Sequence, residues 1–422
     1  MPLPQTRRNL LSRRDFIRAT ASLSGLTALR ALWPGWLPRL AFAQNGIQGD
    51  VIVCIFLRGG ADALNMVVPF GDDNYYRARP LLAMQPPDSR ASSRSLELDG
   101  FFGLNQDMSA LHEIFRAGHM TAIHACGPPN VSRSHFEAMD LMERGTDGES
   151  GADSGWLGRH LMTTASTDDS PLRAIGWDES LQKSLRGYVS AMALQSIADF
   201  HLHGDQELAD DMSVALSAMY QDESVAYNHT AQATLEALET VRKIDIDRYR
   251  PANGAEYDET DLGMALKQTA ALIKAEAGLE VACIDHGNFD THVAQSQLLP
   301  GLVTPFADNL RAFHDDLLSY MDRVTVVVMS EFGRRVQENG GGGTDHGHGG
   351  VLYLMSTHVA AQPVIANWPG LNDDFLENGD LQITTDYRDV LSEVLLHRAR
   401  RTNLDVVFPG HNYAPVGAIR AE

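Results

Sequence analysis

The chain has 422 residues, and 44% of them are hydrophobic, which is enough to bury a sizeable core. Its formal net charge is −21. Residues 1–43 contain seven arginines and one aspartate, so the remainder keeps 27 basic and 54 acidic residues and a formal charge of −27. A surface this acidic argues against nucleic acid as a partner and favours a role of the charge in solubility.

Residues 1–43 have the pattern of an export signal. Arg13 and Arg14 lie in a segment that looks like a twin-arginine signal, and Arg7-Arg8 forms a second, weaker pair. The apolar stretch 19–40 is interrupted by charges and prolines, so it is a poor transmembrane helix, and Ala41-Phe42-Ala43 fits an A-x-A cleavage site. We expect the Tat translocase to export the folded protein to the periplasm or otherwise out of the cytoplasm. The alternative is a basic, disordered N-terminus.

The remaining chain, residues 44–422, alternates strand-like and helix-like segments. In chain order the predicted strands are residues 51–57, 121–126, 279–284, 324–329 and 351–355, and the predicted helices are 108–117, 131–143, 258–275 and 304–321. Residues 72–90 resemble a loop, and helical spacing defines a segment around 207–275. This order predicts one α/β domain with a mostly parallel sheet flanked by helices.

The three cysteines are Cys54, Cys126 and Cys283, and each lies in or just after an apolar run. No C-x-x-C pair is present. The pattern predicts buried core thiols and a fold that does not depend on disulfides.

Two clusters of carboxylates and histidines follow predicted strands. Asp290-Thr291-His292 follows the strand at 279–284. Glu331 closes the strand at 324–329, and Asp345-His346-Gly347-His348 lies in the glycine-rich loop after it. Because parallel strands present groups at their carboxyl ends, these side chains can converge, and both types are ligands of divalent ions. The sequence therefore predicts a divalent metal site, with zinc, manganese or calcium as the candidate ions.

Several of these residues also have a structural interpretation. Glu331 could pair with Arg334 or Arg335, and Asp62 could be a turn residue after Gly59-Gly60. Ser134 could cap a helix. His135 could bind the metal or support a ligand, and either His346 or His348 could coordinate.

Several segments together resemble one protein family, DUF1501, whose fold is taken to be alkaline-phosphatase-like. The resemblance runs in order through nearly all of residues 44–422 and is sharpest at Ser330-Glu331-Phe332-Gly333-Arg334. It rests on residues 56–65, 133–136, 155–159, 289–292, 330–334 and 343–347. The activity of the family is not established, and the wider superfamily includes phosphatases, sulfatases and phosphomutases built on two metal ions.

The resemblance implies a role for each matching position. Asp62 would bind a metal, as would Asp290 with His292, Glu331, and the late Asp345 with His346 or His348. A nucleophile would begin a helix, at Ser134 or its neighbour Ser132. Phe332 stands where the superfamily often has a histidine, so one imidazole of a two-metal site is missing.

These expectations predict an exported, metal-dependent hydrolase of phosphate or sulfate esters. Ser134 would be the nucleophile, and Arg133, Arg58 and His135 would bind the anion. The substrate would be a small anionic ester or an envelope polymer. The alternative is a non-catalytic, metal-binding envelope protein that retains the fold.

Overall fold

The computed structural model describes residues 50–148, 152–164, 172–187, 191–197, 248–399 and 402–420, with a few single residues between 215 and 246. The predicted export signal at 1–43 lies outside these residues, as does most of the stretch 207–243. Within the described part of the chain, no helix combines the length and apolar character needed to cross a bilayer.

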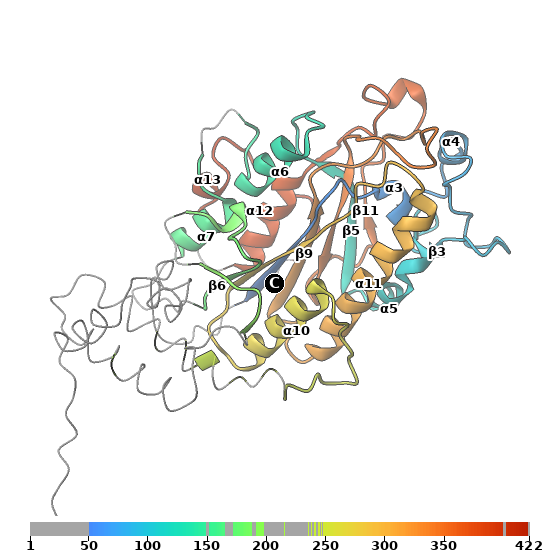
Figure 1. Cartoon of the computed structure of the whole chain (residues 1–422). Coiled ribbons are helices and arrows are strands. Elements are labelled where there is room, and N and C mark those ends of the chain that lie inside the picture. The colour runs from blue at the N-terminus through green and yellow to red at the C-terminus, as the bar shows by residue number, and fades with distance from the viewer. Residues whose placement is uncertain are drawn as a thin grey trace, which may run out of the picture.

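A nine-stranded sheet forms the centre of the molecule (Figure 1). The order along it is β11-β5-β10-β9-β1-β8-β6-β7, and β12 also pairs with β5. Only β10 runs antiparallel to its neighbours, β5 and β9, so the sheet is mostly parallel and the predicted α/β class is confirmed. The strands are β1 Val51–Leu57, β5 Met120–Gly127, β6 Ala174–Trp177, β7 Met192–Ala193, β8 Val281–His286, β9 Val324–Ser330, β10 Gly350–Met355, β11 Val364–Ile365 and β12 Thr385–Asp386.

Helices cover both faces of this sheet (Figure 1). Alternate residues of β1 belong to two different apolar clusters, because successive side chains of a strand point to opposite faces. One cluster includes α5 (Ser109–Arg116), α10 (Asp261–Lys274) and α11 (Gln295–Asp316). The other includes α6 (His135–Arg144), α7 (Trp156–Thr163), α12 (Tyr387–Arg398) and α13 (Leu404–Val407).

Several short elements complete the fold. They are α3 Ala63–Met66, α4 Asp73–Ala78 and the short 3-10 turns Gln106–Met108, Lys183–Leu185 and Asp373–Phe375, with a three-stranded sheet of β2 Val67–Val68, β4 Gly103–Leu104 and β3 Leu96–Glu97. The prediction of a loop throughout 72–90 is wrong at α4, whose start is capped by the Asp72 side chain, which accepts a hydrogen bond from the Asn74 N–H.

The remaining predictions of local structure agree with the fold in most places. All five predicted strands are present, and all three cysteines are buried and free. Three helix starts differ from the prediction by three residues or more, and one of these is α10, which begins at Asp261 rather than at 258. α6 begins at His135, after a turn in which Asn130 accepts from the Ser132 N–H, and α11 begins before Pro300 and includes it.

Candidate metal centre

The carboxyl ends of β1, β8 and β9 lie side by side and lead into the loops that build the site. Gly59, in the loop after β1, has a φ of +116°, and an added Cβ would lie 2.6 Å from the backbone N of Asp290. Only glycine therefore permits this close approach of the β1 loop to the β8 loop.

The buried side chain of Arg334 connects these loops through hydrogen bonds. Its side chain is fully buried and donates to the carbonyls of Gly60 at 2.6 Å, Gly59 at 2.6 Å and Thr344 at 2.8 Å. Nη2 also donates to Oδ1 of Asp290 at 2.6 Å. The sequence interpretation considered Arg334 only as a partner for Glu331; the structure instead uses it to fix Asp290.

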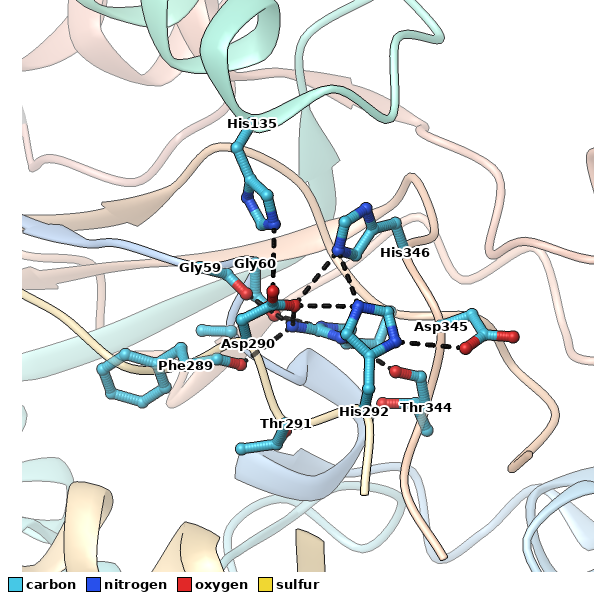
Figure 2. Close-up of polar contacts among 12 residues, drawn as sticks. Gly59, Gly60, His135, Phe289, Asp290, Thr291, His292, Thr344, Asp345 and His346 are labelled. Carbon is cyan, nitrogen blue, oxygen red and sulfur yellow. Dashed lines mark hydrogen bonds and ion pairs between the residues drawn. The ribbon is translucent and has the colours of Figure 1, made fainter. Parts of the chain in front are cut away.

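His135, Asp290 and His346 form the candidate metal-ligand group of the site (Figure 2). One potential ligand atom from each of these three residues lies within 4.8 Å of the other two. Nε2 of His346 lies 3.1 Å from Oδ1 of Asp290, and Nε2 of His135 lies 3.5 Å from Oδ2. His292 adds a fourth donor, because its Nε2 lies 3.0 Å from Asp290 Oδ1 and 2.9 Å from His346 Nε2.

The Nδ1 atom of each of the three histidines faces a hydrogen-bond acceptor. Glu331 Oε1 lies 2.7 Å from His135 Nδ1, Asp345 Oδ1 lies 3.1 Å from His292 Nδ1, and the Arg133 carbonyl lies 2.9 Å from His346 Nδ1. These partners only accept, so each Nδ1 carries the proton and donates it. With its only proton on Nδ1, an imidazole directs the lone pair of Nε2 towards the Asp290 carboxylate, and only an additional proton on Nε2 lets His346 donate to Asp290.

Converging lone pairs repel one another unless a cation or an additional proton lies between them. His292 and His346 bring two such nitrogens to 2.9 Å, and Nε2 of His135 is buried without a hydrogen-bond partner. Histidine ligands whose Nδ1–H is held by a carboxylate or carbonyl are typical of metal sites. The donor set therefore fits a divalent cation.

The electrostatics of the site keep its carboxylates ionised. Burial raises the pKa of Asp290, but hydrogen bonds from His346 and Arg334 outweigh it and bring that pKa to about 2. Burial likewise raises the pKa of Glu331, and the hydrogen bonds from His135 and the backbone N–H of Gly59 lower it overall. The Glu331 hydrogen bond raises the pKa of His135.

The glycine-rich loop is ordered by Asn339, which the sequence analysis did not identify. Its Nδ2 donates to the His292 carbonyl at 3.0 Å and to Asp345 Oδ1 at 2.9 Å, and its Oδ1 accepts from the N–H groups of Gly341 and Gly343. The hydrogen bonds from Asn339 and His292 lower the pKa of Asp345. The position of an asparagine directly before a run of glycines was the available signal.

Residues 117–402 match the family model described as "Protein of unknown function (DUF1501)". The chain belongs to this family. The predicted resemblance is thereby confirmed for the family itself. None of the curated proteins matches the sequence.

The DUF1501 chain is also similar to several solved structures. The alignment with the lipooligosaccharide phosphoethanolamine transferase A of Neisseria meningitidis covers 97% of this chain and 65% of that chain. The identity is 11% and the TM-score is 0.34. For the alkaline phosphatase of the Antarctic bacterium TAB5 the coverages are 76% and 95%, the identity 7% and the TM-score 0.29. For Ps i-CgsB the coverages are 76% of this chain and 68% of that chain, the identity is 11% and the TM-score is 0.32. Likenesses at these scores transfer no activity to the DUF1501 chain.

Two predicted ligands have other partners in this DUF1501 structure. Asp62 lies in a fully buried ion pair with Arg79, at 2.6 Å, and is not a member of the three-residue group. His348 is buried, with Nδ1 2.8 Å from Glu377 and Nε2 3.0 Å from the Pro128 carbonyl. The local geometry thus brings His346, rather than His348, to the cluster.

The predicted anion-binding arginines are already paired with carboxylates. Arg58 donates to Glu143 at 2.9 Å and to Asp285 at 2.9 Å, and Arg133 donates through Nε to Asp380 at 3.0 Å.

The two serines differ in their surroundings. Ser132 Oγ donates to Glu137 at 2.7 Å. Ser134 is exposed and its hydroxyl does not cap α6, although it directly precedes His135.

Proposed function

We propose that this DUF1501 chain is an exported, metal-dependent hydrolase of phosphate or sulfate esters that uses one divalent ion. The observation that carries the proposal is the convergence of three histidine Nε2 atoms on the Asp290 carboxylate. His135, Asp290, His292 and His346 would hold the ion, and Glu331 and Asp345 would orient two of the imidazoles. Export would depend on residues 1–43.

One ion rather than two is supported by the residues around Asp62 and Glu331. The guanidinium of Arg79 already supplies positive charge to the Asp62 carboxylate. Phe332 follows Glu331, and its ring lies 4.9 Å from the ring of His135 and 4.9 Å from that of His346, centroid to centroid. Phe332 therefore offers no ligand to a second ion, and Arg79 pairs with Oδ2 of Asp62, whose Oδ1 is buried without a hydrogen-bond partner.

The ligand types favour zinc or manganese over calcium. Imidazole and carboxylate suit zinc and manganese, whereas calcium is bound by oxygen ligands alone. Such an ion supplies Lewis acidity that stabilises charge on the oxygens of a phosphoryl or sulfuryl group. The Ser134 hydroxyl, exposed and adjacent to His135, is the proposed nucleophile, and the first N–H groups of α6 lie beside it.

The experiment has two stages. Elemental analysis of the folded protein should give about one divalent ion per chain, and the His346→Ala variant should lose it. Metal-replete protein should then hydrolyse an aryl phosphate or an aryl sulfate. Ser134→Ala should abolish this turnover with the metal content intact, whereas Ser132→Ala, the matched control, should remain active.

A non-catalytic envelope protein that binds metal is the second candidate. It is favoured by the pairing of Arg58 and Arg133 with carboxylates, which reduces their capacity to bind an anionic substrate. Stoichiometric metal without turnover of any phosphate or sulfate ester would support this candidate and contradict hydrolysis.

A further inference from the structure

Carboxylates are the exposed charged groups of the metal cluster. The Asp290 side chain is 46% exposed and that of Asp345 is 56% exposed, while Glu331 is fully buried behind His135. A divalent ion and Arg334 would contribute three positive charges, and these three carboxylates contribute three negative ones. With its ion bound, this inner set of groups is therefore neutral.

The nearby arginines add no unpaired positive charge to this neutral set of groups. Arg334 donates to four backbone carbonyls in addition to Asp290, so its donors are engaged. Arg133 is paired with Asp380, and Arg335 lies 3.9 Å from the same carboxylate. Asp380 is itself buried. In the described loops around the cluster, each of these guanidinium groups thus faces a carboxylate of the protein.

Two exposed apolar residues directly follow candidate ligands in the sequence. Phe136 is 86% exposed and directly follows His135, and Val293 is 60% exposed and directly follows His292. Scattered exposed apolar residues are ordinary, but these two come from different segments that meet at the same ion position. An organic group on the substrate would contact them outside the ring of ligands.

We infer that the substrate is a singly charged ester, a phosphate diester or a sulfate ester, rather than a doubly charged phosphate monoester. This inference rests on the proposed metal-dependent function. One negative charge of the ligand can be stabilised by the ion, whereas a second would face Asp290 and Asp345 without a further unpaired cation. The exposed apolar side chains would contact the organic group that such an ester carries.

Anion binding to Co²⁺-loaded protein tests the charge preference without any turnover. Methyl sulfate carries one charge and inorganic sulfate carries two, and both can be titrated at one pH while the visible spectrum of the ion is followed. Methyl sulfate, and dimethyl phosphate as a second monoanion, should bind about three- to tenfold more tightly than sulfate, given the strength of charge repulsion in a partly exposed site. Equal or tighter binding of sulfate would overturn the inference, as would the absence of any spectral response.

A variant with one carboxylate fewer tests whether charge repulsion causes the preference for monoanions. Asp345→Asn keeps an oxygen for His292 but removes one negative charge, so it should strengthen sulfate binding more than methyl sulfate binding. Glu259→Gln, which changes an exposed carboxylate just before α10, is the matched control and should change neither. An identical response of both variants would contradict the role assigned to Asp345.

The apolar contact has its own measurement. Diphenyl phosphate should bind more tightly than dimethyl phosphate, and Phe136→Ser should reduce that advantage. Leu318→Ser, which removes an exposed apolar side chain after the end of α11, should leave it unchanged. Failure to hydrolyse any ester would contradict the proposed function alone, because these titrations use bound anions and require no reaction.

Discussion

Nδ1 of His135 lies 2.7 Å from Oε1 of Glu331, and this contact determines which nitrogen of the imidazole faces Asp290. Glu331 is fully buried and also accepts a hydrogen bond from the Gly59 N–H at 2.8 Å. The same carboxylate thus binds the β1 loop and orients the histidine. Glu331 was predicted as a metal ligand, and its contact with His135 is the geometry of a group that orients a ligand.

Glu331→Gln should weaken metal binding, because the amide is a poorer acceptor for His135. Loss of such a supporting carboxylate typically lowers metal affinity about 10–100-fold. The Glu331 hydrogen bond raises the pKa of His135, and a proton on Nε2 competes with the metal. The variant should therefore bind less tightly at high pH while its pH midpoint for metal binding moves to lower pH.

Glu393→Gln provides the control for this substitution. Glu393 is equally buried, but its carboxylate accepts from the N–H groups of Val416, Gly417 and Ile419. That variant should lower the unfolding midpoint without changing the affinity or the pH midpoint for Co²⁺ or Zn²⁺. If Glu331→Gln matches it in all three measurements, the orienting role of Glu331 is wrong.

His346→Ala and His348→Ala should separate metal binding from folding. His346→Ala removes a donor atom from the three-residue group, so bound metal should fall, along with the stabilisation that metal adds to the fold. His348→Ala should retain the metal but lower the unfolding temperature measured with chelator present, since His348 is buried against Glu377 and the Pro128 carbonyl. The reverse pattern would assign coordination to His348.

Much of this arrangement could be predicted from local sequence. Continuous apolar runs predicted the five strands, and the rule that parallel strands present their carboxyl ends at one edge predicted that Asp290 and Glu331 could converge. In the structure His135 contacts both of them. The choice between His346 and His348 could not be predicted in this way. Both lie in one glycine-rich loop, and their directions depend on the bridge between His346 and Arg334 and on the acceptors that surround His348.

Long-range pairing explains the other differences. Asp62 was a reasonable ligand candidate because it follows a strand, but its partner Arg79 comes from a segment predicted as a loop. Arg334 reaches carbonyls in the loops after β1 and β8 and in the glycine-rich loop, a role that no local pattern encodes. Such contacts are set by tertiary packing of segments far apart in the chain, so the sequence predicted residue types more reliably than partners.

Export should require the twin-arginine pair. Changing both Arg13 and Arg14 to lysine keeps the charge but removes the side chains that the translocase is expected to recognise, so precursor should accumulate in the cytoplasm. The same change at Arg7 and Arg8 is the matched control and should leave export normal. Fractionation followed by immunoblotting measures both, and normal periplasmic levels of the first variant would contradict the signal assignment.

Acid should destabilise the fold through buried histidines. Burial lowers the pKa of both His124 and His160 from 6.5 to about 4. The unfolded chain then binds more protons between these values, so stability is present above about pH 6.5 and is lost as the pH falls towards 4. Each histidine can account for about 3 kcal/mol at the acid end. Urea unfolding with chelator should show this slope, reduced in His160→Gln and unchanged in His397→Gln, an exposed control.

Gly343→Ala and Gly340→Ala should differ sharply although they lie in one loop. A Cβ at Gly343 would lie 2.4 Å from the backbone carbon and oxygen of His292, so the loop or the ligand has to move. A Cβ at Gly340 meets nothing within 4 Å. Gly343→Ala should therefore weaken Zn²⁺ or Co²⁺ binding about tenfold or more, as loss of a supporting contact does at other sites, while Gly340→Ala should bind as the unaltered protein does. Calorimetric titration compares the two. Equal affinities would show that the packing of the glycine-rich loop against His292 does not position the ligand.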